Sequence, residues 1–170
     1  QVERMNPNEL SFVVALKACS CIAEKQDIAT EIMPLEVGQA LHIDAQRKHF
    51  ASDSLFGTVL LSLYGKCGAL LEAEDIFSGL VERDIVSWNA LISGLAQFGN
   101  SEEVIETLEA MQNEGISPDI VTFISSLRAF TIVEDLEKGQ ELHKYIVVVG
   151  FDKDVVIGNT LVSLYAKCGA

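Results

Sequence analysis

Residues 61–68 of the chain, Leu-Ser-Leu-Tyr-Gly-Lys-Cys-Gly, return with two changes as residues 162–169, Val-Ser-Leu-Tyr-Ala-Lys-Cys-Gly. Residues 35–42, Leu-Glu-Val-Gly-Gln-Ala-Leu-His, return at the same offset of 101 positions as residues 136–143, Leu-Glu-Lys-Gly-Gln-Glu-Leu-His. A fixed internal period is the sequence signature of a repeat architecture. An irregular helical bundle needs no such period, so the pattern favours a chain of repeats.

The 101-residue period divides into shorter units. Residues 58–68 align with residues 89–99 at an offset of 31, and both blocks end in a glycine that can close a helix. Near the N-terminus the offset rises to 111, as between Phe12 and Phe123, so the first copy carries 10 additional residues. We place them between about Ser20 and Pro34, as a lengthened turn between two helices. The predicted units are residues 9–53, 54–84, 85–119 and 120–154, followed by a partial unit at 155–170.

Unit 85–119 has the pattern of two helices joined by a turn. Its first apolar stripe follows the i, i+3, i+4, i+7 spacing of one helix face and consists of Trp88, Leu91, Ile92 and Leu95. Gly99 ends this helix, and Asn100 or Ser101 can cap the next one. We expect helices at about 86–97 and 101–114. Because a single hairpin cannot cover the apolar stripes of both helices, the predicted fold is all-α, a right-handed α-solenoid of stacked helix-turn-helix repeats.

Composition excludes several classes of protein. The chain has 170 residues, of which 49% are hydrophobic and 22% charged, as in a folded soluble protein. It contains no apolar run of the roughly 18–20 residues that a membrane helix needs, and its first residues lack the layout of a signal peptide. The net charge of -13 argues against a nucleic-acid partner, because phosphate contacts normally require a basic surface.

The cysteines predict neither a zinc site nor a disulfide framework. Cys19, Cys21, Cys67 and Cys168 form no Cys-x-x-Cys motif and no histidine–cysteine cluster with zinc spacing. We therefore expect reduced, buried thiols, with Cys67 and Cys168 in the core. No cofactor is expected. His42 and His143 recur with the repeat, which favours a packing role over a catalytic one.

Residues 84–99, Asp-Ile-Val-Ser-Trp-Asn-Ala-Leu-Ile-Ser-Gly-Leu-Ala-Gln-Phe-Gly, and residues 161–169 resemble plant-type pentatricopeptide repeats (PPRs) of the mixed-length PLS class, which cycles units of different length. Unit 85–119 resembles the standard type and unit 54–84 the short type. Units 9–53 and 120–154 resemble the long type, the first with its insertion, and 155–170 resembles part of a short unit. Tetratricopeptide repeats share the architecture, but their period and aromatic pattern fit less well.

The resemblance implies that the first helices line a groove in which each repeat faces one base of single-stranded RNA. In the family, the fifth and last residues of a unit choose that base. Here these pairs are Thr58 with Asp84, and Asn89 with Asp119, while Asn159 begins a further pair. The pairs Val13 with Asp53, and Ile124 with Asp154, lack a polar fifth residue and should read weakly or not at all. Base-packing residues at second positions would be Leu55, Val86, Val121 and Val156, and phosphate contacts would come from Lys66 and Lys167.

Each of these roles has a plainer alternative. Asn89 could be a helix cap and Asp119 a turn residue. Val86 and Val121 could belong to the core, which would be favoured without the resemblance. Lys66 and Lys167 lie near predicted helix C-termini, where a positive charge favours the helix dipole in any protein. Trp88 is expected to be a packing residue.

Three functional hypotheses follow. The first is an RNA-binding tract of a mitochondrial or chloroplast RNA-processing factor, similar to proteins that guide cytidine-to-uridine editing, with other editing proteins as further partners and neither a membrane nor a small-molecule substrate. The second is a protein-binding solenoid, which the charge of -13 favours. The third is an enzyme. A zinc deaminase needs His-x-Glu and Cys-x-x-Cys, which this chain lacks, so we expect it not to be an enzyme and any catalytic domain to lie beyond Ala170.

Overall fold

The computed structural model describes residues 9–23, 32–47 and 54–170. Within these ranges the chain forms nine α-helices and no strand. It divides into two compact units, Gln1–Arg83 with helices α1 to α4, and Asp84–Ala170 with helices α5 to α9. The helices are α1 (Glu9–Ala23), α2 (Ile32–Arg47), α3 (Ser54–Lys66), α4 (Leu70–Gly79), α5 (Ile85–Gln97), α6 (Ser101–Asn113), α7 (Ile120–Val133), α8 (Leu136–Val148) and α9 (Val155–Lys167).

In the first unit, α3 is the central helix and packs against α1, α2 and α4. The ring of Phe12 on α1 meets the ring of Phe56 on α3 edge to face, with centroids 6.4 Å apart. Leu16, Leu60, Leu61 and Leu63 are fully buried around this contact. The predicted insertion between Ser20 and Pro34 falls mostly on residues 24–31, which lie outside the described residues.

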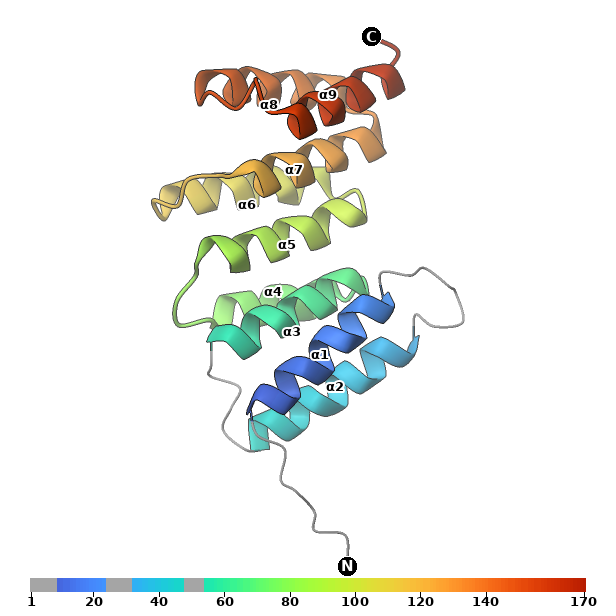
Figure 1. Ribbon diagram of the computed structural model, residues 1–170, viewed down its shortest axis with the longest axis vertical. Helices are drawn as coiled ribbons and strands as arrows, with labels where there is room; N and C mark the ends of the chain where they lie inside the picture. Colours follow the sequence, from blue (N-terminus) through green and yellow to red (C-terminus); the bar gives the residue numbers. More distant parts are fainter. Residues whose placement is uncertain (1–8, 24–31, 48–53) are drawn as a thin grey trace, which may run out of the picture. The chain divides into compact units, whose positions relative to one another are not determined.

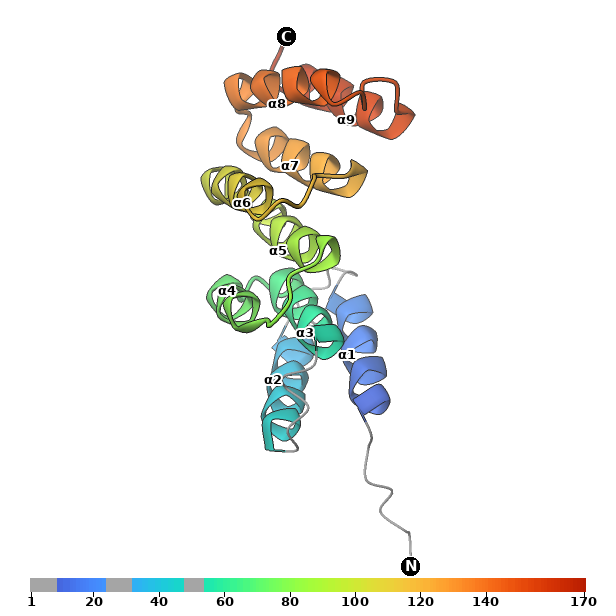
Figure 2. The same cartoon turned by 90° about the vertical axis from the view of Figure 1, so that its left-hand side faces the viewer.

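In the second unit, the first helices of successive hairpins lie side by side. Helix α7 packs against both α5 and α9, while α6 and α8 form a second layer behind them (Figures 1 and 2). The largest fully buried side chains between these layers are Ile92, Leu95, Met111, Phe123, Leu127 and Phe130. Trp88 is also buried, as predicted for a packing residue. Stacked helical hairpins therefore confirm the predicted all-α solenoid.

The helix bounds of unit 85–119 confirm the prediction to within one residue, since α5 and α6 span Ile85–Gln97 and Ser101–Asn113. Gly99 has a φ of 74°, in the left-handed region that favours glycine, and its N–H bonds the carbonyl of Ala96 as the chain leaves α5. Asn100 occupies the N-cap position of α6, but its side chain makes no capping hydrogen bond. Its backbone ψ of 69° differs from the extended conformation that side-chain caps usually adopt. The unit boundaries themselves stay a prediction.

The expectation that the cysteines are buried is wrong for three of the four. Cys19 is buried, Cys21 is exposed, and Cys67 and Cys168 are half-buried, and none of these four forms a disulfide. Cys67 directly follows the last residue of α3, and Cys168 is the C-cap of α9. Each is followed by a glycine with positive φ, Gly68 or Gly169, where the chain turns away from the helix axis. In both cases the helix ends one residue before the thiol.

Two glycines at equivalent positions of the period allow close helix contacts. A Cβ built on Gly38 would overlap Cδ2 of Leu63, and a Cβ on Gly139 would overlap Cδ2 of Leu164. Leu63 and Leu164 are fully buried. The contacts bring α2 against α3 in the first unit and α8 against α9 in the second. The repeated Leu-Glu-x-Gly sequence is thus explained by a second helix that passes close to the next first helix.

Replacing Gly139 by Ala should destabilise the protein, because Leu164 must leave its packed position in a site without spare volume. Overpacking costs about 1–3 kcal/mol, which exceeds the roughly 0.5–1 kcal/mol that Ala contributes over Gly within a helix. Gly158→Ala is the matched control, since no atom lies within 4 Å of a Cβ there, and it should raise the free energy of unfolding. Urea unfolding followed by circular dichroism measures both. A Gly139→Ala variant as stable as Gly158→Ala would contradict the close contact.

Candidate nucleic-acid interface

The aspartates that end the predicted units are helix caps. Asp84, Asp119 and Asp154 are the N-cap residues of α5, α7 and α9. Each carboxylate accepts the backbone N–H three residues later, from Ser87 at 2.9 Å, Thr122 at 2.9 Å and Ile157 at 3.0 Å. Such caps satisfy N–H groups that have no partner within the helix. These aspartates are therefore needed to begin the first helices, whatever the groove binds.

Asp119 does more than cap its helix, because it also holds Asn89 of the neighbouring first helix. The Nδ2 of Asn89 donates to Oδ1 of Asp119 at 3.0 Å. The hydroxyl of Thr122 lies 2.6 Å from Oδ1 of Asn89 and 2.9 Å from Oδ1 of Asp119. Asn89 and Asp119, the predicted pair, are therefore joined by a direct hydrogen bond. The plainer alternative is wrong for both residues, because Asp119 is a helix cap rather than a turn residue and Asn89 lies within α5 rather than at its cap.

The hydrogen bonds at Asp119 favour its charged form. Partial burial raises the pKa of this carboxyl, but the hydrogen bonds from the backbone of Thr122, from Asn89 and from the Thr122 hydroxyl outweigh it. The net result is a pKa below the usual aspartate value. A charged carboxylate orients the Asn89 amide, because only the NH2 end of the amide can face it.

The apolar residues at the second positions are exposed. Leu55 on α3 is 54% exposed, and Val86, Val121 and Val156 on α5, α7 and α9 are 57%, 50% and 54% exposed. The alternative that Val86 and Val121 belong to the core is therefore wrong. Asn89 follows Val86 by three residues, so the two side chains lie on the same helix face. The Val86 side chain is therefore exposed to solvent, one helical turn from the Asn89–Asp119 pair.

The remaining predicted residues take several positions. Asn159 is exposed on α9, and Ile124 is half-buried on α7, whereas Val13 is buried in α1 and cannot contact a base. Asp53 lies outside the described residues. Thr58 is half-buried on α3 in the first unit, and Asp84 begins α5 in the second, so their pairing stays a prediction.

The two predicted phosphate contacts lie at helix ends. Lys66 and Lys167 are the last residues of α3 and α9, and Lys167 is exposed while Lys66 is half-buried. At these positions both lysines favour the helix dipole, as the plainer alternative held. Contact with a phosphate group stays a prediction for both.

Charge is unevenly distributed between the two kinds of helix. Helices α3, α5, α7 and α9 contain no Asp or Glu, and their basic residues are Lys66, Arg128 and Lys167. Helices α4 and α6 contain no Lys or Arg, and their acidic residues are Glu72, Glu74, Asp75, Glu102, Glu103, Glu106 and Glu109. The net charge of -13 therefore does not describe α3, α5, α7 and α9, which carry Thr58, Asn89, Ile124 and Asn159.

Three contacts link helices that the sequence analysis did not connect. Nδ1 of His143 lies 2.8 Å from the Tyr165 hydroxyl, and Nδ1 of His42 lies 3.4 Å from the Tyr64 hydroxyl. The sequence contained a signal for the two histidine–tyrosine contacts, because both residues recur together with the 101-residue period. Burial lowers the pKa of His42, which favours its neutral form. The third contact joins the hydroxyls of Ser93 on α5 and Ser125 on α7 at 2.9 Å.

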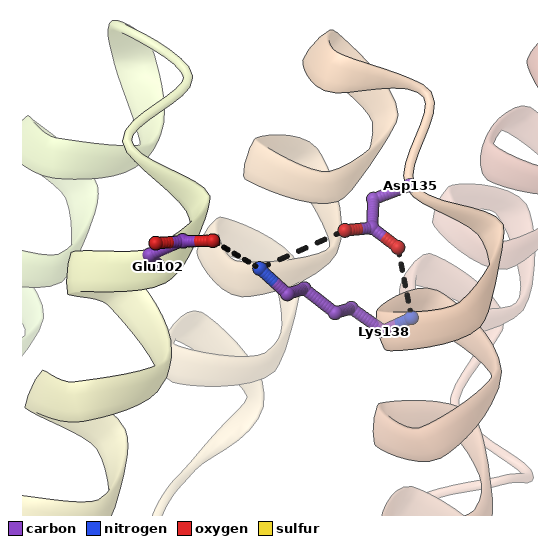
Figure 3. Close-up of polar contacts among 3 residues, drawn as sticks. All are labelled: Glu102, Asp135 and Lys138. Atoms are coloured by element: carbon purple, nitrogen blue, oxygen red, sulfur yellow. Dashed lines mark hydrogen bonds and ion pairs between the residues drawn. The ribbon is translucent and has the colours of Figure 1, made fainter.

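An ion-pair cluster joins the second helices of the second unit. Nζ of Lys138 on α8 lies 3.5 Å from Glu102 on α6 and 3.7 Å from Asp135, the N-cap of α8 (Figure 3). The Glu102 side chain is 83% exposed, so solvent screens this pair and it contributes little to stability. Residues from different repeats form it, which is why no local motif revealed it.

Other kinds of site find no support in the described part of the chain. No group of three or more His, Cys, Asp or Glu side chains there is placed to hold a metal ion. None of the described helices is both long and apolar enough to cross a bilayer. What the geometry defines is an α-helical repeat protein with a row of polar and apolar positions along its first helices.

Comparisons with known proteins identify the repeat. A model of the PPR repeat family matches residues 83–131, and a PPR repeat model matches residues 58–85. A chloroplastic pentatricopeptide repeat-containing protein of Arabidopsis thaliana is 34% identical over 98% of this chain and 19% of its own length. A second Arabidopsis relative, whose name marks it as mitochondrial, is 32% identical over 98% of this chain and 26% of its own length. The chain belongs to the pentatricopeptide-repeat proteins, and it spans about a fifth to a quarter of these relatives.

Solved structures agree in fold. The crystal structure of the pentatricopeptide repeat protein PPR10 in complex with an 18-nt psaJ RNA element has a TM-score of 0.74 and 23% identity, and it covers 96% of this chain and 23% of that one. The structure of PPR10 from maize has a TM-score of 0.69 with 19% identity. These likenesses establish the helical-repeat architecture.

Replacing Asp119 by Ala should lower the free energy of unfolding by about 1–2 kcal/mol at neutral pH, because the cap and the bonds to Asn89 and Thr122 are lost together. Asp154→Ala is the matched control, since it removes an N-cap that has no side-chain partner of this kind. Its effect should be smaller. Equal losses in urea unfolding would mean that the bond to Asn89 adds nothing to stability.

The stability difference between the unaltered chain and Asp119→Ala should also depend on pH. The pKa of Asp119 is lowered by folding, so its contribution is complete above the unfolded value of about 3.9 and disappears as the pH falls through the lower, folded value. The stability difference between the unaltered chain and Asp119→Ala should therefore shrink in acid. A difference that stays constant from neutral pH to below the folded pKa would contradict the assigned hydrogen bonds.

Proposed function

We propose that the chain binds single-stranded RNA along its first helices, with about one base facing each repeat, as part of an organellar RNA-processing factor. The observation that carries the proposal is the Asn89–Asp119 hydrogen bond, at 3.0 Å, beside the exposed Val86. A polar side chain with both a donor and an acceptor, held in one orientation next to an exposed apolar side chain, is what recognition of an unstacked base requires.

The Asn89 amide suits the edge of uracil. Its NH2 group has two protons and its oxygen has two lone pairs, and Asp119 and Thr122 use only one of each. The remaining N–H can donate to a uracil carbonyl, while the oxygen accepts the N3–H of the base. In the family this combination of Asn and Asp favours uracil. Val86 and Val121 would pack against the base faces, which explains why apolar side chains remain exposed there.

The order of bases follows from the order of units. With RNA running 5′ to 3′ as the protein runs from N- to C-terminus, Thr58 with Asp84 selects guanine and Asn89 with Asp119 selects the following uracil. Unit 120–154 comes next and tolerates any base, because the Ile124 side chain cannot form a hydrogen bond. Within α3, α5, α7 and α9 there is no acidic residue, and the acidic N-caps Asp84, Asp119 and Asp154 lie at the helix ends, so these helices should repel phosphate less than α4 and α6 do.

The proposed cellular role rests on the relatives. Those quoted above carry chloroplastic and mitochondrial names, which supports an organellar location for the longer protein. Among organellar processes we propose cytidine-to-uridine editing, because the alternation of long, short and standard units resembles that of editing factors. The chain itself would supply RNA binding and no catalytic residue.

A second candidate is a protein-binding solenoid. The acidic residues of α4 in the first unit and of α6 in the second favour it. Because these residues lie on the second helices, an acidic binding surface there is compatible with RNA binding along the first helices. RNA titration distinguishes them, because a protein-binding solenoid alone would show no base preference.

The isolated chain should bind RNA weakly and with strong salt dependence. It offers a handful of base contacts, each stacked base contributes about 1–3 kcal/mol, and the net charge of -13 opposes phosphate. Fluorescence anisotropy with a short unstructured RNA at two salt concentrations measures this. Submicromolar binding that is insensitive to salt would contradict the electrostatic argument.

Replacing Asn89 by Thr should change base preference at one nucleotide. The substitution exchanges an amide for a hydroxyl and leaves Asp119 in place, so preference should move from uracil toward guanine by about three- to tenfold. Competitive binding measures it, with RNAs that differ only at that base and a longer repeat array that contains this chain. Val162→Ala, an exposed substitution elsewhere, serves as the control. Unchanged preference in the Asn89 variant would show that Asn89 is structural and that the assigned register is wrong.

A further inference from the structure

A hydroxyl residue follows each polar fifth residue at a constant place in the next unit. Thr58 is followed by Ser87, and Asn89 by Thr122, each being the third residue of the next predicted unit. The apolar fifth residues Val13 and Ile124 are instead followed by Phe56 and Ile157 at the same place. A hydroxyl at the third position can form a hydrogen-bonded link to a polar fifth residue of the preceding unit.

The structure provides such a link in the second unit. The Thr122 hydroxyl has one proton and two nearby acceptors, Oδ1 of Asn89 at 2.6 Å and Oδ1 of Asp119 at 2.9 Å. The Asp119 oxygen already accepts the Thr122 N–H at 2.9 Å and the Asn89 Nδ2 at 3.0 Å. The Thr122 hydroxyl therefore donates its proton to the Asn89 oxygen, the closer and less occupied acceptor. Because the hydroxyl also accepts the Asp119 N–H at 3.1 Å, its own orientation is fixed by the backbone.

We propose that Thr122 is a positioning residue that fixes the orientation of the Asn89 amide and thereby makes this repeat prefer uracil over cytosine. The inference rests on the proposed RNA-binding function. It concerns a residue that is fully buried and does not itself contact the base. Asp119 holds the NH2 end of the amide and Thr122 holds the oxygen end, so both ends have chemically distinct partners.

The two pyrimidines need opposite orientations of the amide. Uracil presents a donor at N3 beside an acceptor at position 4, whereas cytosine presents an acceptor at N3 beside a donor at position 4. An amide that pairs with uracil must be turned over to pair with cytosine in the same place. Turning it over would point the Asn89 oxygen at the Asp119 carboxylate and its NH2 group at the Thr122 hydroxyl, which already accepts a backbone proton. Fixing the amide therefore disfavours cytosine.

The equivalent residue of the preceding unit has a different contact, which provides a control. The hydroxyl of Ser87 donates to the backbone oxygen of Asp84 at 2.8 Å, while its N–H bonds the Asp84 carboxylate. Ser87 is buried and serves the cap of α5, just as Thr122 serves the cap of α7. Ser87→Ala thus removes a buried hydroxyl from a comparable cap without altering the contacts of Asn89.

The test compares Thr122→Val, which keeps the shape of the side chain but cannot donate, with Thr122→Ser, which keeps the hydroxyl. Binding is measured for RNAs with uracil or cytosine at the nucleotide assigned to Asn89, in a longer repeat array that contains the whole chain. Thr122→Val should reduce the uracil-to-cytosine affinity ratio by about three- to tenfold, the factor one hydrogen bond supplies. Thr122→Ser should restore the ratio, and Ser87→Ala should leave it unchanged at this nucleotide.

A second readout needs no RNA. In the 170-residue chain, the side-chain amide signals of Asn89 in NMR spectra should shift and lose order in Thr122→Val, but stay unchanged in Thr122→Ser and Ser87→Ala. Unchanged Asn89 signals in Thr122→Val would overturn the positioning role. A retained uracil-to-cytosine ratio in that variant would overturn the selectivity role. If the unaltered array has no base preference at this nucleotide, the proposed function fails there and the selectivity role fails with it, while the NMR comparison still decides the positioning role.

Discussion

The N-terminal caps of α5, α7 and α9 are the constraint on which the candidate interface depends. The carboxylates of Asp84, Asp119 and Asp154 begin α5, α7 and α9 by accepting N–H groups that the helix cannot pair internally. The start of a helix determines which residue is second and which is fifth in the unit. The position of an aspartate therefore decides which side chains are exposed and which are buried. At Asp119 the same oxygen also accepts the Asn89 amide, so the cap that begins one helix orients a side chain of its neighbour.

Close packing of the first helices makes this geometry possible. Helix α7 lies against both α5 and α9, which brings the start of one helix within hydrogen-bond distance of the next. Gly139, on the second helix α8, allows Leu164 to pack against the helix backbone and so draws α9 toward α8. The buried phenylalanines, Phe123 and Phe130, fill the space between the layers. A rigid scaffold of this kind is needed because an amide orients a base only if its own position is fixed.

The distribution of charge reduces the conflict between the acidic composition and the proposed nucleic-acid partner. The acidic residues of α4 and α6 account for much of the excess, whereas α3, α5, α7 and α9 contain none. The field close to the first helices depends on nearby charges, because salt screens the more distant ones over roughly 10 Å. Net charge is thus a poor guide to the partner of a protein whose helices differ so much in charge. In the proposed complex it would still weaken overall affinity, since diffusing RNA meets the field of the whole molecule.

The sequence by itself determined the repeat and the helix bounds of unit 85–119, because these depend on local periodicity, while the candidate pairs came from the family resemblance. The bounds of α5 and α6 and the buried stripe of Trp88, Leu91, Ile92 and Leu95 agree with it. Periodicity could not show that Cys67 and Cys168 leave the core, since the chain turns at the glycine that follows each of them. Only the tertiary structure decided that Val86 and Val121 are exposed and that Thr122 joins Asn89 to Asp119. The physical reason is that a hydrogen bond between residues 33 positions apart exists only once two first helices have packed together.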